Sequence, residues 1–111
     1  MIIYVAGPYT GPSIAEIDIN VAIAQAAGIE IMKRGHVALV PHTMTHHWDV
    51  GTGLTYEQFI AATMALLERC DAICMCGGWG QSNGALGELK RARELGLHVY
   101  YNHEAVPEAK Q

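Results

Sequence analysis

A serine and a glutamate six residues apart lie in the part of the sequence best suited to chemistry. Ser82 follows the glycine-rich segment 77–80, and Glu88 lies in the charged, leucine-containing segment that comes next. The apolar run 72–76 precedes them, so the order predicts a strand, a glycine-rich turn and a helix that begins near Ser82. Such a helix N-terminus presents unpaired N–H groups and a positive dipole end to an anion. The stretch therefore predicts an anion-binding corner with a carboxylate beside it.

Both residues also have a purely structural interpretation. Ser82 can cap the helix through its hydroxyl without touching a ligand. Glu88 shares a helix face with the small residues Ala85 and Ala92, which predicts a position near the sheet, where a carboxylate must be paired, protonated or catalytic. If the helix is turned the other way, Glu88 faces solvent and pairs with the Lys or Arg that follows it. Periodicity alone leaves these alternatives open.

A second group of polar residues lies in the irregular stretch 42–53. It contains His42, His46, His47 and Asp49. Histidines four apart with a carboxylate could bind zinc on a helix, but the surrounding proline, threonines and glycines argue against a helix. We therefore expect no metal ion and no cofactor. Instead, His42 or Asp49 is expected to contact a ligand, and the length of the stretch indicates a functional or mobile loop.

Three aromatic residues complete the candidate set. Tyr4 lies in the first apolar run and is expected in the core, with a hydroxyl that can reach the ligand-binding edge of the sheet. Tyr9 and Trp79 lie in the loops that follow the first and third predicted strands. Their flat rings suit stacking against a base, although either could instead cover the sheet.

The elements that must position these residues alternate along the chain. Strands are expected at 2–6, 37–40, 71–76 and 98–101, and helices at 13–34, 55–69 and 82–95. This alternation predicts a three-layer α/β domain, flavodoxin- or Rossmann-like, with a mostly parallel sheet of four to five strands in the order 2-1-3-4. The loops 7–12 and 77–84 then face each other across one cleft. The polar tail from Asn102 is expected to fray.

Length and composition limit the number of domains and the classes of partner. The 111 residues suffice for one domain, 1–111; half are hydrophobic, and the net charge is −4. Without a basic block, binding to nucleic acid is not expected, and no apolar run approaches the ~20 residues that span a membrane. The first apolar run ends at Gly7-Pro8 like a strand, so we expect a cytoplasmic protein. Cys70, Cys74 and Cys76 lie in or beside an apolar run and are expected to be reduced and buried.

Several of these segments resemble the nucleoside 2-deoxyribosyltransferase superfamily and, within it, the compact branch DUF4406. The resemblance is carried by residues 3–11, 41–42 and 70–72 and by the pattern Gly78-Trp79-x-x-Ser82-x-Gly84-Ala85-x-x-Glu88. It implies an enzyme that cleaves the N-glycosidic bond of a nucleoside 5′-monophosphate or nucleoside, by hydrolysis or transfer. It also implies a homodimer or larger homo-oligomer, because relatives complete their site with residues from a neighbouring subunit.

The resemblance assigns catalytic roles position by position. Glu88 matches the nucleophile, and its place near a helix N-terminus is expected to keep it ionised. Tyr4 matches the tyrosine that hydrogen-bonds the nucleophile. The resemblance assigns no acid to protonate the leaving base, and Asp49 and His42 are candidates from the sequence alone. Relatives usually carry an aspartate near the sugar where this chain has Thr63, within one residue of alignment. That departure concerns catalysis more than binding.

The resemblance also implies a substrate-binding set. Ser82 matches the phosphate-binding serine of the nucleotide hydrolases in the superfamily, and the first loop is expected to hold the same phosphate. The substrate-binding residues predicted in this way are Gly7, Tyr9, Thr10, Gly11, His42, Trp79, Ser82 and Gly84. Two alternatives stay open: a non-catalytic module that senses or sequesters a nucleotide, and an assembly protein with a vestigial site.

Overall fold

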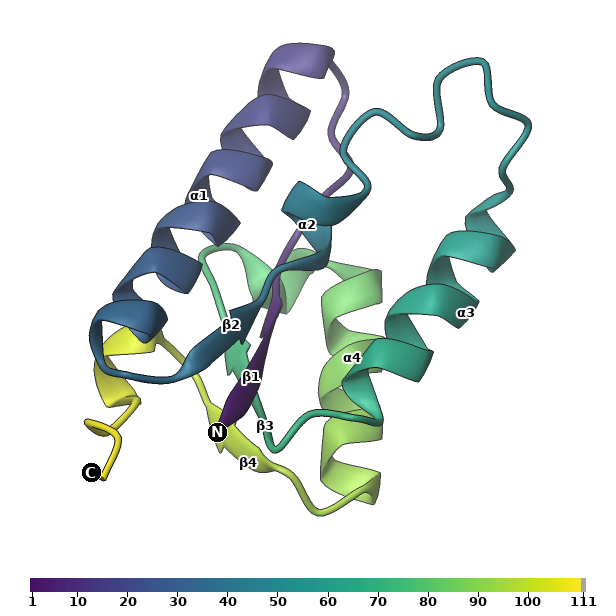
Figure 1. The fold of residues 1–111 in the computed structure, drawn as a ribbon. Coiled ribbons are helices and arrows are strands. Elements are labelled where there is room, and N and C mark those ends of the chain that lie inside the picture. Colours follow the sequence, from purple (N-terminus) through teal and green to yellow (C-terminus); the bar gives the residue numbers. More distant parts are fainter. Residues whose placement is uncertain (111) are drawn as a thin grey trace.

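The computed structural model describes residues 1–110 and contains a four-stranded sheet with helices on both faces (Figure 1). The strands are β1 (Ile2–Ala6), β2 (Val37–Leu39), β3 (Ala72–Met75) and β4 (His98–Tyr100). All neighbouring pairs are parallel, and their order is β2-β1-β3-β4. The predicted α/β class and the predicted strand order are therefore confirmed.

Four α-helices connect and cover these strands in the described part of the chain. They are α1 (Ile14–Lys33), α2 (Pro41–Met44), α3 (Tyr56–Leu67) and α4 (Asn83–Glu94). In Figure 1, α1 lies on one side of the sheet, whereas α3 and α4 lie on the other. Because successive residues of a strand point to opposite faces, alternate residues of β1 and β3 enter two separate cores.

The two cores account for the nearly unbroken apolar sequence of the central strands. Ile3 and Val5 of β1 join the core under α1, while Tyr4 and Ala6 join the core under α3 and α4. All four side chains are at most 1% exposed. A strand buried on both faces is expected to be apolar throughout. Tyr4 is the exception in β1, and its buried hydroxyl therefore needs a hydrogen-bond partner.

Two expectations about irregular segments are corrected. The stretch after β2 does not begin as a loop, because Pro41 starts the single helical turn α2, as proline does readily at a first helical position. The tail is docked over its described residues, 102–110: Val106 is 3% exposed in the core under α1, and the Ala109 N–H donates to the Arg34 carbonyl at 2.8 Å. One apolar side chain, this backbone bond and the His36 imidazole, whose Nε2 lies 2.7 Å from the Pro107 carbonyl oxygen, hold it in place.

The three cysteines are free and buried, as expected. Burial raises the pKa of the Cys74 thiol to about 12 and that of Cys76 to about 11. Both therefore stay protonated at neutral pH and behave as small apolar side chains. Among the described residues, no helix is long and apolar enough to cross a membrane.

Candidate active site

A cleft of about 550 Å³ opens at the carboxyl-terminal ends of β1 and β3. This is the end of a parallel α/β sheet at which ligands bind. The loop after β1, the loop after α2, one face of α3 and the start of α4 form its walls. The predicted site residues that line the cleft are Tyr4, Gly7, Tyr9, Thr10, His42, Asp49, Ser82, Gly84 and Glu88.

Glu88 faces this cleft from the second turn of α4. The hydroxyl of Tyr4, which rises from β1 and is 1% exposed, donates a hydrogen bond to Oε2 of Glu88. The solvent-facing alternative is not realised, since Arg91 pairs instead with Glu68 at 3.1 Å. Glu88 is partly buried and lines the cleft. The strand and the helix thus hold a carboxylate where a ligand would lie.

The protonation of this pair differs from the sequence-based expectation. Burial raises the pKa of Glu88 to about 7, although the hydrogen bond from Tyr4 opposes the rise. Loss of hydration therefore outweighs the positive end of the α4 dipole, which weakens within the first turn. Burial and the nearby Glu88 charge raise the pKa of Tyr4, so its hydroxyl remains a neutral donor. Near neutral pH, Glu88 exists in both its protonated and its ionised form.

The start of α4 presents several donors to the cleft. The Ser82 hydroxyl oxygen accepts the Ala85 N–H at 3.2 Å and so caps the helix, which leaves its own hydrogen free to be donated. The N–H groups of Asn83 and Gly84 belong to the first turn and have no intrahelical acceptor. Ser82, Asn83 and Gly84 all line the cleft. Capping and anion binding are therefore compatible roles for Ser82.

His42 holds the loop after β1 through its imidazole ring. Its Nε2 lies 3.1 Å from the Gly7 carbonyl oxygen and 3.0 Å from that of Pro8. Both oxygens can only accept, so Nε2 carries the hydrogen. Burial lowers the pKa of His42, although these two bonds oppose the decrease. His42 is therefore a neutral side chain that holds the loop in place.

Close packing and one amide fix the rest of this loop. A Cβ at Gly7 would lie 2.2 Å from the Cys76 Sγ, so only glycine fits where β1 approaches β3. The Asn20 amide of α1 donates to the carbonyls of Tyr9 and Thr10 at 3.1 and 3.4 Å. Sequence reasoning missed Asn20, because a polar residue in a helix carries no local signal that identifies a distant acceptor.

Two predicted substrate-binding residues do not line the cleft. Gly11 packs against the start of α1, where a Cβ would lie 2.9 Å from the Cβ of Glu16. Trp79 contacts Tyr101, with ring centroids 5.7 Å apart and the ring planes tilted by 35°, and packs against the core under α4. Its arrangement matches the alternative in which this ring covers the sheet.

One wall of the cleft was anticipated from the sequence only at Thr63. Tyr56, Phe59, Ile60 and Thr63 line it from α3, and Leu54 continues it into the preceding loop. The four helical positions follow the spacing i, i+3, i+4, i+7, which marks one face of a helix. This spacing could have identified one face of α3 from the sequence, but it could not have shown that this face borders a cavity.

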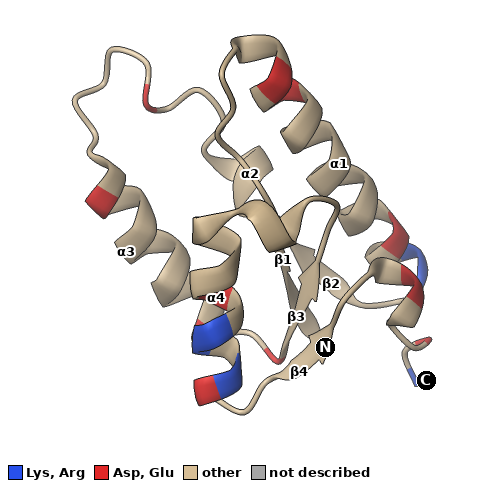
Figure 2. Cartoon of the chain, turned by 180° about the vertical axis from the view of Figure 1, so that it is seen from behind, with Lys and Arg blue, Asp and Glu red and all other residues tan. Residues whose placement is uncertain are grey.

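The cleft contains little charge. Of the described residues that line it, none is Lys or Arg, and the carboxylates are Asp49 and Glu88. Figure 2 shows the Lys and Arg of α1 and α4 near the C-terminal ends of these helices, away from the loops that form the cleft. Any anion bound here would therefore be held by N–H and hydroxyl groups.

Comparison with known proteins agrees with this architecture. Residues 1–101 match the family described as "Domain of unknown function (DUF4406)". The chain belongs to this family. No curated protein sequence matches the DUF4406 chain. Among solved structures, it is similar to a 2-deoxyribosyltransferase from the psychrotolerant bacterium Bacillus psychrosaccharolyticus, with a TM-score of 0.61 and 19% identity over 89% of this chain and 69% of that one. The DUF4406 chain thus has the predicted nucleoside 2-deoxyribosyltransferase-like fold.

Proposed function

We propose that this DUF4406 protein binds a nucleoside 5′-monophosphate or nucleoside and cleaves its N-glycosidic bond, by hydrolysis or transfer. The observation that carries the proposal is the Glu88 carboxylate in the cleft, held by the Tyr4 hydroxyl. The similarity in fold to a 2-deoxyribosyltransferase supports the same class of reaction. A cleft of about 550 Å³ has the size of a small-molecule site.

In the proposed reaction, ionised Glu88 acts as the nucleophile. Its Oε1 attacks the anomeric carbon while the bond to the base breaks and the bonding electrons leave with the base. Positive charge develops on the sugar only in the transition state, so a carboxylate beside it lowers the barrier. Water or a second base then displaces the glutamate from the glycosyl ester, as in retaining glycosidases.

Tyr4 and Asp49 take the supporting roles in this scheme. Tyr4 donates to Oε2 and fixes the carboxylate so that Oε1 faces the sugar. The leaving base needs a proton, and the Nε2 hydrogen of His42 is already donated to the carbonyl oxygens of Gly7 and Pro8. Asp49, which lines the cleft from the loop after α2, is therefore the better candidate.

The substrate would span the two chemically different walls. The α4 N-terminus, with Ser82, and the hydroxyls of Tyr9 and Thr10 supply donors for a phosphate. Phe59 and Leu54 on the opposite side offer apolar surface for a base. Without a lining Lys or Arg, the phosphate contributes through hydrogen bonds, so we expect the nucleotide to bind only modestly better than the nucleoside.

Two observations favour a second candidate function, a module that binds nucleotides without cleaving them. Thr63 lines the cleft at the position where the resemblance leads one to expect an aspartate. The pKa of Glu88, about 7, also leaves a substantial part of the protein without an ionised nucleophile at neutral pH. Both features weaken catalysis while leaving the phosphate-binding groups in place.

The predicted homodimer or larger homo-oligomer is part of the proposal. Large apolar side chains are exposed along α1, among them Ile19 at 57% and Met32 at 63%. Covering such side chains with a second copy would remove apolar surface from water. Sedimentation equilibrium checks this directly, and a monomer at all concentrations would contradict it.

Release of free base distinguishes the two functions. The wild-type protein and Glu88→Gln are incubated with a panel of nucleoside 5′-monophosphates and the matching nucleosides, and free base is measured by chromatography. Glu94→Gln is the control, because Glu94 is an exposed carboxylate at the end of the same helix. We expect base release from the wild type and the control but not from Glu88→Gln. Binding of a nucleotide by the wild type without base release would refute the enzyme and support the module.

A further inference from the structure

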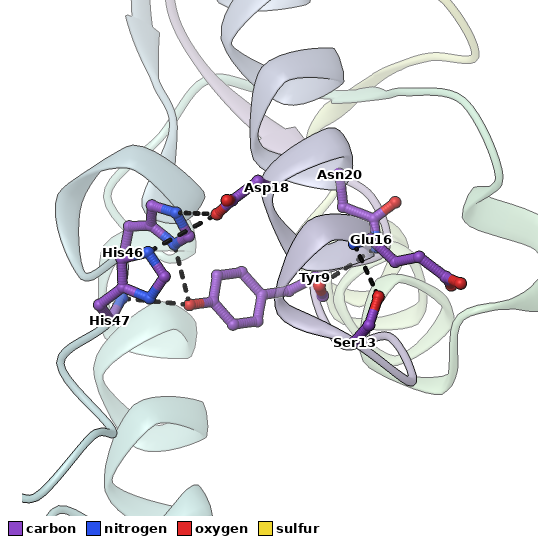
Figure 3. Close-up of polar contacts among 7 residues, drawn as sticks. All are labelled: Tyr9, Ser13, Glu16, Asp18, Asn20, His46 and His47. Carbon is purple, nitrogen blue, oxygen red and sulfur yellow. Dashed lines mark hydrogen bonds and ion pairs between the residues drawn. The ribbon is translucent and has the colours of Figure 1, made fainter.

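Two histidines and an aspartate meet beside the cleft, outside the proposed active site. Asp18 lies in the second turn of α1, and His46 and His47 follow α2. The Nε2 atoms of His46 and His47 lie 2.9 and 3.6 Å from the same oxygen, Oδ1 of Asp18. Figure 3 shows both imidazole rings turned toward this carboxylate. One ligand atom from each residue lies within 4.8 Å of the others.

The chemistry and the spacing of these three atoms suit a transition metal ion. Imidazole nitrogen and carboxylate oxygen are standard zinc ligands, with bonds of about 2.0–2.2 Å. In a tetrahedral site with such bonds, two ligand atoms are about 3.3–3.5 Å apart. The measured distances of 2.9 and 3.6 Å fall on either side of this range. Two of the three ligand pairs thus lie near the spacing of a tetrahedral site, and the two imidazole rings are stacked with centroids 3.7 Å apart.

The outer contacts of His46 provide a second, independent observation. Its Nδ1 lies 3.3 Å from the hydroxyl oxygen of Tyr9, and the backbone N–H of His47 donates to that oxygen at 3.4 Å. Without a metal ion, Nε2–H of His46 donates to the Asp18 carboxylate at 2.9 Å, because a carboxylate can only accept, and in the neutral imidazole the Tyr9 hydroxyl then donates to Nδ1. A metal ion at Nε2 would replace that hydrogen, and Nδ1–H could then donate to the Tyr9 oxygen. A metal-binding histidine typically donates its other ring N–H in this way. Figure 3 shows the Tyr9 hydroxyl beside the two histidines, in contact with both residues.

The set differs from the one considered on sequence grounds. His42 and His46 do not share a helix, since α2 ends at Met44, and His42 is turned inward to the first loop. The carboxylate comes instead from α1, 28 residues before His46. Only the fold brings Asp18 to the histidines, so sequence spacing could not identify this group.

We propose that Asp18, His46 and His47 bind one zinc ion, with water in the fourth position. The site departs from the expectation that the chain binds no metal ion. It does not depend on the proposed function, because none of its three ligands lines the cleft. A bound ion would link α1 to the start of the loop that follows α2, which is the loop that contains Asp49. Tyr9 contacts this site and also lines the cleft.

Metal titration of the tag-free protein tests the proposal. Zn²⁺ binding is measured by calorimetry, and Co²⁺ is used as a spectroscopic probe because tetrahedral Co²⁺ absorbs strongly in the visible range. We expect one ion per chain and an intense visible band with Co²⁺. Asp18→Asn and His46→Ala should each lower the affinity by more than about 100-fold, and Tyr9→Phe by about 10–100-fold, the range known for outer partners.

His98→Ala is the matched control, because His98 is an exposed histidine on β4, far from the cluster in the fold. It should bind zinc like the wild type. Thermal unfolding without metal checks that each variant is folded. Because Asp18 is exposed, we expect Asp18→Asn to fold, and this variant still tests the site if a histidine variant does not fold. Absence of saturable binding to the wild type would overturn the proposal. Equal affinity in the wild type and Asp18→Asn would overturn it as well.

Discussion

Replacing Glu88 by glutamine should stabilise the protein at neutral and alkaline pH. The pKa of Glu88 rises from 4.5 to about 7 in the folded state because burial disfavours the ionised form. Below pH 4.5 the carboxyl is protonated in both the folded and the unfolded state, and burial then has no such cost. As the pH rises from 4.5 to 7, the unfolded state loses its proton first, so the free energy of unfolding falls.

The magnitude follows from the two pKa values. Each pH unit between them corresponds to about 1.4 kcal/mol, so ionisation of Glu88 lowers the stability by about 3 kcal/mol above pH 7. Glutamine has the same shape, can accept the Tyr4 hydrogen bond and carries no charge. Glu88→Gln should therefore be more stable than the wild type by up to about 3 kcal/mol at pH 8 and nearly equal to it at pH 4.

Urea unfolding followed by circular dichroism measures this difference at several pH values. Glu94→Gln serves as the control, because the exposed carboxylate of Glu94 at the end of the same helix has no comparable burial. Its stability relative to the wild type should change little with pH. Equal stability of the wild type and Glu88→Gln at pH 8 would refute the reasoning, since it would mean that burial costs the carboxylate nothing.

Three further outcomes are expected from the site and its supports. Gly7→Ala should lose about 1–3 kcal/mol of stability in urea unfolding, because its Cβ would lie 2.2 Å from the Cys76 Sγ, whereas Gly87→Ala, which meets nothing within 4 Å, should not. Ser82→Ala should lose about 1 kcal/mol of stability with the helix cap and, in calorimetry, bind nucleotides more weakly while nucleoside affinity stays the same. If base release occurs, its kcat/KM should rise with pH through about 7 as Glu88 ionises, and a rate independent of pH between 5 and 8 would contradict Glu88 as the nucleophile.

The fold was largely predictable because its signals are local. The central strands are buried on both faces, so their apolar runs stand out in the sequence, and Thr55 and Ser82 each cap the helix that follows them. Alternation of strands and helices then leaves few topologies. The docked tail was missed because it is held by one buried side chain, Val106, one backbone bond and a contact from the His36 imidazole, and none of these produces periodicity.

The site was predictable only where its residues belong to a motif. Glu88 and Ser82 lie on one short segment, and the first loop has its own glycine-rich pattern. Asn20, by contrast, acts through a bond that joins α1 to the loop before it. The protonation of Glu88 also could not be read from the sequence, because helix position and burial act in opposite directions and only the folded structure gives the degree of burial.

The residue at position 63 affects the pKa of Glu88 and therefore the pH dependence of the proposed reaction. An aspartate at this position would place a second negative charge near Glu88 and raise its pKa further, and the two carboxyls would titrate together. With threonine there, burial is the main cause of the raised pKa of Glu88. The acidic limb of a pH–rate profile should then follow a single ionisation near pH 7. A steeper limb, with two protons, would contradict a single ionising carboxyl, and Asp49 could not supply the second ionisation in this scheme, because it must keep its proton to protonate the leaving base.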